Sequence, residues 1–443
     1  MIKHTLTLLF FSILMVFTAC QSEKGQEKSN ASNEYASKAP TPEWSQDAVI
    51  YEVNIRQYTK EGTFNAFADH LPRLKELGVD ILWLMPVHPI GEEKRKGSLG
   101  SYYSVKDYKG INPEFGNMED FRNLVKKAHD MDMYLILDWV ANHTAWDHPW
   151  TEEHPDWYLT NDDGEIIAPH EDWTDVAGLD YDNREMRSEM TDALKFWVEE
   201  ADIDGYRCDV AGMVPVDFWE AAREELEEVK PLWMLAEDED ETELLEYAFN
   251  ANYGWSFHHI MNDVANGEKD ATHITGYFNQ IDSVYPTGAY PMQFTSNHDE
   301  NSWNGTVFER MGKEAAKTMA ALTFTAEGMP LIYSGQEVGL DKQLEFFEKD
   351  QIEWKEESDM TDLYQDLTSL QSANQALWNG KAGGEMTFID TNEEEKVLCF
   401  SRRKDGNTVV ALFNLSDDPV NVSAEGGPEG TFVEAMNDRE VTL

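Results

Sequence analysis

Two oppositely charged residues stand two positions apart near the end of a short apolar segment, residues 203–210. In a β-strand alternate side chains share a face, so Arg207 and Asp209 would lie side by side. A guanidinium keeps a neighbouring carboxylate ionised and orients its oxygens, which suits a carboxylate nucleophile. For this pair alone, a structural ion pair is the simpler interpretation. A chemical role therefore depends on what else converges on the pair.

Two further acids follow apolar segments of strand length: Glu237 comes after residues 232–236, and Asp299 after residues 292–296. The carboxyl ends of barrel strands meet at one face, so three such acids would surround one pocket. Crowded carboxylates destabilise a fold unless they are used or neutralised. The available partners are Arg207, His143 and His298.

Glycosidic bond hydrolysis requires two carboxyl groups with opposite tasks, one ionised and one protonated. Asp209 suits the first task, because Arg207 is expected to lower its pKa. Glu237 leaves an apolar strand and precedes three more acids, so burial and like charges are expected to raise its pKa. Asp299 could hold sugar hydroxyls and help to distort the ring.

The elements that must position these residues alternate between strand-length apolar runs and stretches of helical periodicity. Helices are expected between the runs, for example over 118–130 and 185–201. Eight strands close into a (β/α)8 TIM barrel without leaving an exposed sheet edge. The predicted strands are 49–57, 80–87, 134–140, 203–210, 232–236, 249–253, 292–296 and 330–333.

The barrel domain is assigned to residues 43–378. Residues 144–183 are dense in Trp, His, Pro and Asp and too long for an ordinary connection, so they are expected to form a subdomain inserted after the third strand. Residues 379–443 show short strand-like runs without helices, and Lys404-Asp405-Gly406-Asn407 suits a hairpin turn. A C-terminal antiparallel β-sandwich domain is therefore expected.

Charge narrows the choice of partners. The 443 residues include 35 basic and 85 acidic side chains, which gives a formal net charge of −50. Such a chain is unsuited to nucleic acid or to anionic membrane surfaces, and a neutral polyhydroxyl substrate fits better. The charge by itself is explained by solvation of the surface.

The N-terminus has the features of an export signal over residues 1–19, with Lys3 before an apolar run and small residues before Cys20. This pattern resembles a bacterial lipoprotein processing site, which predicts a lipid on Cys20 and anchoring in the periplasm or on the outer-membrane surface. Residues 20–42 are expected to be a flexible tether. Cys208 and Cys399 lie in separate apolar segments and are expected to be buried free thiols.

Several of these stretches together resemble the α-amylase family, glycoside hydrolase family 13, from about Trp44 onward. The main matches are Asp138 to His143, Gly205 to Asp209, Glu237 and Phe294 to Asp299. Tyr103 to Tyr108 and Gly328 to Gly335 support them.

The resemblance implies residue roles that spacing alone does not supply. Asp209 would be the nucleophile, Glu237 the acid/base and Asp299 a stabiliser of the transition state. Arg207, His143 and His298 would contact the substrate or the nucleophile, and Tyr103 would stack on the sugar at the cleavage site. The resemblance also implies retention at the anomeric carbon and an α-glucan or malto-oligosaccharide substrate.

Departures from the family pattern concern calcium and the outer subsites. Gly212-Met213 stands where many relatives carry Lys-His, whose His commonly binds calcium, and another calcium-binding Asp is replaced within 176–180. Asn142 keeps its ligand type, but calcium needs about six to eight oxygens. We expect no required cofactor, no metal ligands and at most weak calcium binding. The loop 341–354 also lacks the Arg with which the family often holds sugar hydroxyls.

The expected function is that of a retaining α-glycosidase (EC 3.2.1) acting on starch-like substrates. A transglycosylase or glucoside isomerase of the same family would use the same chemistry and differ in the acceptor. A non-catalytic glucan-binding protein is the alternative from another class, and the presence of all three acids argues against it.

Overall fold

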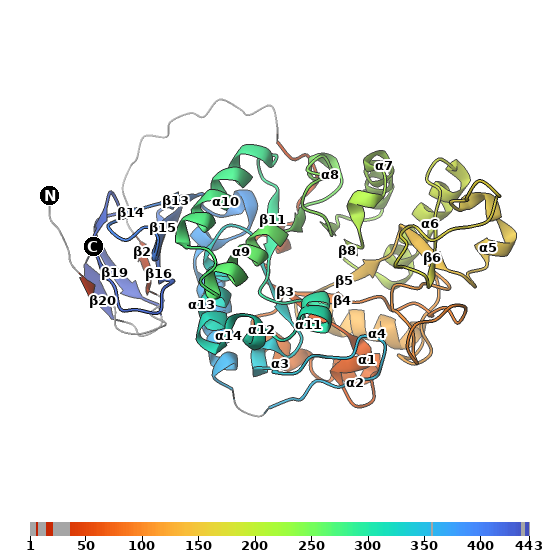
Figure 1. The fold of residues 1–443 in the computed structure, drawn as a ribbon, viewed down its shortest axis with the longest axis horizontal. Coiled ribbons are helices and arrows are strands. Elements are labelled where there is room, and N and C mark those ends of the chain that lie inside the picture. The colour runs from red at the N-terminus through yellow and green to blue at the C-terminus, as the bar shows by residue number, and fades with distance from the viewer. Residues whose placement is uncertain (1–5, 8–14, 21–35, 356–357, 436–438, 443) are drawn as a thin grey trace.

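The computed structural model describes residues 6–7, 15–20, 36–355, 358–435 and 439–442. Its centre is a closed barrel of eight parallel strands (Figure 1), which confirms the expected TIM barrel. The strands are shorter than the apolar runs that predicted them. In barrel order they are β3 (Ile50–Val53), β4 (Ile81–Leu84), β5 (Tyr134–Trp139), β8 (Gly205–Cys208), β9 (Trp233–Ala236), β10 (Ala251–Tyr253), β11 (Tyr290–Gln293) and β12 (Met329–Tyr333).

Alternation along the strands divides the barrel residues between two apolar clusters. Ile50 and Trp83 belong to the cluster inside the barrel, whereas Tyr51 and Leu82 pack outward against the helices. Glu52 shares the parity of Ile50 and is 0% exposed. It is therefore a carboxylate inside the barrel.

Helices surround the barrel. The first helical stretch after β3 is divided into short helices, and Pro72 lies in the first turn of α3 (Leu71–Glu76), where its missing N–H is tolerated. The helices are α1 (Ile55–Tyr58), α2 (Phe64–Ala68), α3 (Leu71–Glu76), α4 (Met118–His129), α6 (Arg184–Ala201), α7 (Val216–Glu227), α8 (Leu244–Tyr247), α9 (Trp255–Ala265), α10 (Ala271–Val284), α11 (His298–Asn304), α12 (Val307–Met311), α13 (Lys313–Thr325) and α14 (Asp359–Ala373).

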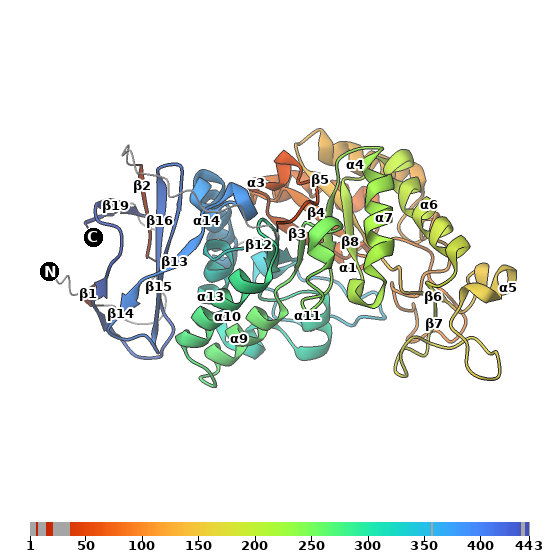
Figure 2. The same ribbon diagram turned by 90° about the horizontal axis from the view of Figure 1, so that it is seen from above.

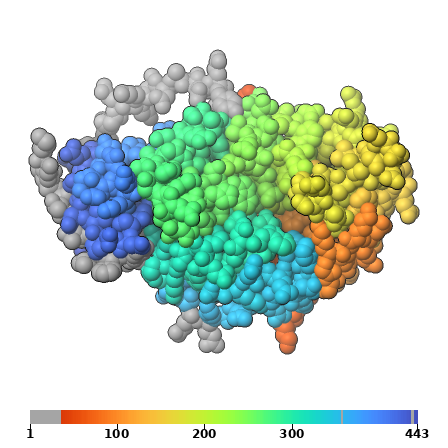
Figure 3. All heavy atoms as spheres, in the orientation of Figure 1, coloured from red at the N-terminus to blue at the C-terminus, as the bar shows by residue number. Residues whose placement is uncertain are grey.

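The inserted subdomain follows β5. Strands β6 (His143–Ala145) and β7 (Val176–Gly178) pair antiparallel and close it, and α5 (Trp150–Glu153) lies between them in sequence. The subdomain and the C-terminal sheet lie at opposite ends of an elongated molecule (Figures 1 and 2). The space-filling view shows the same arrangement (Figure 3).

The C-terminal strands and one N-terminal strand, β2 (Met15–Cys20), form an antiparallel six-stranded sheet in the order β13-β15-β16-β2-β19-β20. The predicted hairpin turn is present, with Asp405 and Gly406 at φ of 46° and 86°. Bounds are β13 (Met386–Phe388), β15 (Val397–Lys404), β16 (Asn407–Asn414), β19 (Thr431–Glu434) and β20 (Glu440–Thr442), with smaller pairs formed by β1 (Leu6–Thr7), β14 (Asp390–Thr391), β17 (Asn421–Val422) and β18 (Ala424–Glu425).

Strand β2 (Met15–Cys20) lies between β16 and β19 in this sheet. It falls mostly within the predicted export signal, whose residues 1–5 and 8–14 lie outside the described residues, as do tether residues 21–35. Within the described ranges, no helix is both long and apolar enough to span a membrane. Cys208 and Cys399 are buried free thiols, as expected.

Arg402 of β15 joins the C-terminal sheet to the barrel domain. Its side chain is 1% exposed and donates to five backbone carbonyl groups. These belong to Thr325, Ala326, Leu377, Trp378 and Gly384. Burial lowers the pKa of Arg402 to about 10, because its effect is larger than the opposite effect of the nearby Glu327 charge.

Candidate active site

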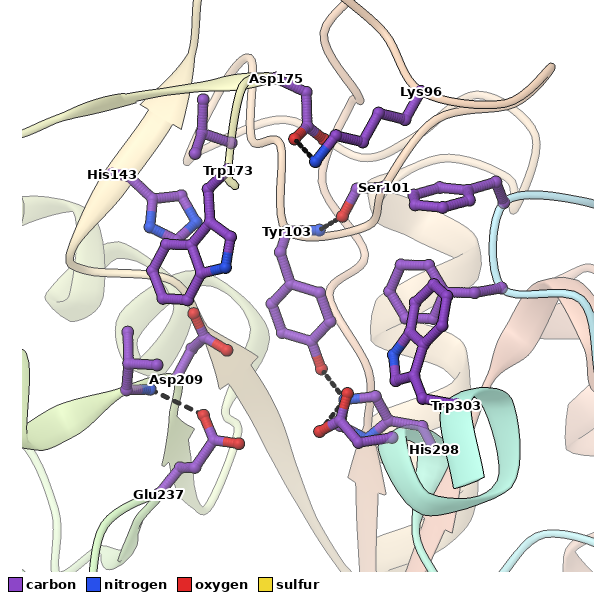
Figure 4. Close-up of a pocket in the computed structure, with 15 residues that line it drawn as sticks. Lys96, Ser101, Tyr103, His143, Trp173, Asp175, Asp209, Glu237, His298 and Trp303 are labelled. Carbon is purple, nitrogen blue, oxygen red and sulfur yellow. Dashed lines mark hydrogen bonds and ion pairs between the residues drawn. The ribbon is translucent and has the colours of Figure 1, made fainter. Parts of the chain in front are cut away.

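The three predicted acids end three barrel strands: Asp209 follows β8, Glu237 follows β9, and Asp299 lies in the first turn of α11 after β11. They line one pocket (Figure 4). The pocket is also lined by Tyr103, His143 and His298. Arg207 is 0% exposed and lies among the carboxylates. The seven predicted residues therefore converge, and their chemical roles remain predictions.

Arg207 is shared among carboxylates from three strands. Its Nη1 lies 2.8 Å from Asp138 Oδ1 and 3.2 Å from Asp209 Oδ1, and its Nη2 lies 2.7 Å from Glu237 Oε1. Burial and the Glu237 charge outweigh this guanidinium and raise the pKa of Asp209 well above its usual range. Arg207 does lower the pKa of Asp209, as expected, but burial and the charge of Glu237 raise it by more, so the net shift is opposite to the expected one.

One guanidinium among these carboxyl groups leaves the site short of positive charge. Burial also raises the pKa of Asp138 to about 6, against the opposing effects of Arg207 and His298. A site of this kind favours holding a proton among its carboxyl groups near neutral pH. A retained proton is what a general acid needs.

A strained turn fixes Glu237 relative to Asp209. Val210 adopts φ 40° and ψ 48°, a left-handed conformation that β-branched residues rarely take. In this conformation its backbone N–H donates to Glu237 Oε2 at 2.8 Å. At the start of β8, a Cβ on Gly205 would lie 1.8 Å from the carbonyl oxygen of Trp233, so only glycine lets the two strands pair.

His298 lies in a buried chain of hydrogen bonds. Its Nδ1 is 2.6 Å from Glu52 Oε1, and its Nε2 is 2.8 Å from Tyr103 Oη and 3.2 Å from Asp299 Oδ2. Burial by itself lowers the pKa of His298, but the charges of Asp299 and Glu52 outweigh it and raise the value to about 9. Since Tyr103 Oη donates to Asp138 Oδ2 at 3.0 Å, it accepts from a doubly protonated His298.

His143 is the opposite case, because burial lowers its pKa to about 4 and keeps it neutral. Asn142 Nδ2 donates to Nδ1 of His143 at 3.2 Å, which leaves the proton on Nε2. The ring lines the pocket 5.6 Å from the ring of Trp173, measured between centroids. His143 therefore faces the pocket as a neutral ring, next to the backbone of Tyr103.

Sequence reasoning missed several residues of the site. Glu52 could have been found as an acid inside an apolar strand, as Asp138 also is. The aromatic walls of the pocket had no comparable signal, because they come from the last turn of α11 and from loops whose course the sequence does not reveal. They are Trp173, Trp303, Phe346 and Phe347.

The residues present do not fit calcium. Within 176–180, where the replaced ligand was expected, Gly178 has no side-chain oxygen, and a Cβ there would lie 2.9 Å from Leu159 Cδ1 and 3.3 Å from Pro169. A Cβ at Gly212 would lie 2.1 Å from Asp238 Oδ2, so no larger residue fits there without a shift. Within the described part of the chain, no three His, Cys, Asp or Glu side chains group as a metal site.

Two protein families match this chain. The family described as "Alpha amylase, catalytic domain" matches residues 27–173 and 156–397, and "Maltogenic Amylase, C-terminal domain" matches 386–443. An α-amylase of Haloarcula japonica is 28% identical over 412 residues, which are 88% of this chain and 58% of that protein. The chain thus spans less than two thirds of that relative.

A maltosyltransferase of Picrophilus torridus, named for α-1,4-glucan and maltose 1-phosphate, is 26% identical over 86% of this chain and 62% of its own. The crystal structure of a noncanonic maltogenic α-amylase from Thermotoga neapolitana superposes with a TM-score of 0.82 at 32% identity, covering 89% of this chain and 93% of that one. The crystal structure of an α-amylase from Lactobacillus plantarum superposes with a TM-score of 0.81 at 32% sequence identity, covering 90% of this chain and 96% of that one. The chain belongs to the α-amylase catalytic-domain family.

Proposed function

We propose that the protein hydrolyses α-glucosidic bonds in malto-oligosaccharides or starch-like α-glucans with retention at the anomeric carbon. The observation that carries the proposal is the meeting of Asp209, Glu237 and Asp299 in one aromatic-lined pocket. Two carboxyl groups with separate tasks are the minimum for this chemistry, and aromatic faces suit the apolar faces of sugars.

In the first step, Glu237 gives its proton to the glycosidic oxygen while a carboxylate oxygen of Asp209 bonds to the anomeric carbon and the carbon–oxygen bond breaks. In the second step, Glu237 takes a proton from water, the water oxygen bonds to the same carbon, and Asp209 is released. The imidazolium of His298 and the carboxylate of Asp299 would hold the sugar hydroxyls as positive charge develops on the ring.

The test uses Asp209→Asn and Glu237→Gln, each checked for folding by its melting temperature. We expect each variant to lose activity on maltoheptaose by about a thousandfold or more. Proton NMR of the first wild-type products should show the α-anomer before mutarotation. Activity that survives in both variants, or a β-anomer as the first product, would rule out the mechanism.

Transfer to a sugar acceptor is the second candidate, and the resemblance to a maltosyltransferase favours keeping it. It needs the same glycosyl-enzyme and differs only in whether water or a sugar hydroxyl takes the glycosyl group. Products longer than the starting oligosaccharide at high concentration would indicate transfer, whereas shorter products alone indicate hydrolysis.

We also propose export and lipid anchoring through Cys20, supported by the N-terminal sequence pattern. Processing before Cys20 would remove most of β2 from between β16 and β19. Mass spectrometry of the mature N-terminus tests this directly. A diacylated Cys20 supports the proposal, whereas an intact residue 1–19 segment in the purified protein contradicts it.

A further inference from the structure

Three aromatic side chains form a shelf beside the catalytic carboxylates: Trp303, Phe346 and Phe347. Trp303 is 56% exposed, more than any other large hydrophobic side chain in the described part of the chain. Exposed aromatic surface forgoes the stabilisation of burial, so its place on the rim of the pocket suits a bound apolar surface. No step of the proposed reaction uses the shelf.

The shelf continues the aromatic surface of Tyr103. The rings of Tyr103 and Phe346 are 6.3 Å apart between centroids and 11° from parallel. The ring centroid of Trp303 lies 5.4 Å from that of Phe346 and 5.9 Å from that of Phe347. Trp303 is also four residues after Asp299 on α11, about one helical turn away, so both stand on the same side of the helix.

The shelf is held in place before any ligand binds. Asn301 of α11 is 3% exposed, accepts from the N–H of Leu344 at 2.9 Å and donates to the carbonyl oxygen of Lys342 at 3.1 Å. Gln343 Nε2 donates to the carbonyl oxygen of Ser302 at 2.7 Å. The loop that carries the two phenylalanines is thereby fixed to α11, and little ordering is left for binding to impose.

The position of the shelf relates it to one side of the scissile bond. Trp303 and Glu237 lie on opposite sides of the pocket (Figure 4). In the proposed function the leaving group lies beside Glu237, which protonates it, so the shelf lies on the side of the retained glycosyl chain. Of residues 341–354, those that line the pocket are Phe346 and Phe347.

We propose that Trp303, Phe346 and Phe347 form a subsite that binds the apolar face of the second glucosyl unit on the glycone side. This rests on the proposed function and specifies its substrate as an α-linked chain with at least two glucosyl units before the cleaved bond. Stacking buries the flat apolar face of a sugar on an aromatic ring, and the rings of the shelf are already oriented for this contact.

The test compares p-nitrophenyl α-maltoside, which reaches the shelf, with p-nitrophenyl α-glucoside, which does not. We expect Trp303→Ala to lower kcat/KM for the maltoside by about tenfold and for the glucoside by less than about twofold. Trp303→Phe should restore most of the maltoside activity. Tyr247→Ala, at a 41% exposed aromatic of α8 outside the pocket, should change neither rate.

An equal loss on both substrates, or no loss on either, would overturn the subsite. If the wild-type protein cleaves neither of these substrates nor maltoheptaose, the proposed function fails, and calorimetry with maltotriose in the Glu237→Gln background then decides the inference separately. Trp303→Ala should weaken that binding by about tenfold. Unchanged affinity, or no binding before the change, contradicts the shelf. Phe346→Ala provides a second variant with the same expected split.

Discussion

Replacing Glu52 by Gln should impair the reaction through His298, although Glu52 does not line the pocket. Glu52 is 0% exposed, and its Oε1 holds His298 Nδ1 at 2.6 Å. Its other oxygen has no hydrogen-bond partner among the described residues. Glutamine keeps the size and one acceptor but removes the charge, so the change isolates the electrostatic effect on the imidazole.

The magnitude follows from the pKa of His298, which rises from 6.5 to about 9 because Asp299 and Glu52 together outweigh burial. A tenfold change in proton affinity is worth about 1.4 kcal/mol, so this rise corresponds to about 3 kcal/mol in favour of the imidazolium. Removing one of the two charges should lower the pKa of His298 by about 1 or more. A neutral ring protonated on Nδ1 would then present a lone pair to Asp299 Oδ2, 3.2 Å away.

The assay is the pH profile of kcat and KM. In Glu52→Gln we expect kcat at pH 8 to fall by about twofold or more, because lowering the pKa of His298 from about 9 by about 1 leaves only about half of the rings protonated there. KM should change little, and the loss at pH 6 should be small. Stability gives a second measure, because the raised pKa of His298 stabilises the fold fully below pH 6.5 and this contribution is lost as pH rises through about 9. Urea unfolding should show a smaller loss over this window in the variant.

A double-mutant cycle with His298→Asn separates this role from a structural one. Once His298 is absent, Glu52→Gln should cost little further activity. The matched control is Glu337→Gln: Glu337 is also 0% exposed but bonds Tyr51 and Arg73 on the outer side of the barrel. It should lose stability without the pH-dependent fall in kcat. Additive effects of the Glu52 and His298 changes would refute the reasoning.

Two further outcomes follow from the structure. Arg402→Met should lower the free energy of unfolding, measured in urea titrations, by about 3 kcal/mol, because buried carbonyl groups between the two domains would lose their hydrogen-bond donor. The same change at the exposed Arg403 should lower it by less than about 0.5 kcal/mol. Excess EDTA should change the melting temperature by less than about 1 °C and leave the rate of hydrolysis unchanged, because Gly178 and Gly212 supply no side-chain ligands for calcium. A loss of stability or activity that added calcium restores would contradict this.

The order of strands and the convergence of the acids were predictable from sequence. Apolar runs marked each strand, and barrel geometry alone requires that residues such as Asp209 and Glu237, at strand ends, meet at one face. The motif that contains His298, together with the other matching stretches, indicated the α-amylase family. The turn at Asp405 and Gly406 was predictable for the same local reason, since two left-handed residues suit that sequence.

Contacts between strands were not predictable, and they account for the errors. Arg207 was paired with its neighbour in sequence, but its shortest contacts are to Glu237 and Asp138 on adjacent strands. Glu52 stands out in the sequence as an acid inside an apolar run, but its contact with His298 of α11 does not follow from any local pattern. The shelf at Trp303 depends on how a loop 40 residues later in the sequence folds back on α11, which no local pattern encodes.

The roles of the two carboxyl groups are tested most directly by azide rescue of Asp209→Gly and Glu237→Gly with an activated α-maltoside. We expect azide to enter the space left by Asp209 and give the β-maltosyl azide, because it attacks from the face of the missing nucleophile. In Glu237→Gly it should intercept the glycosyl-enzyme and give the α-azide. The reverse pattern, or the same anomer from both variants, would contradict the assignment of nucleophile and acid/base.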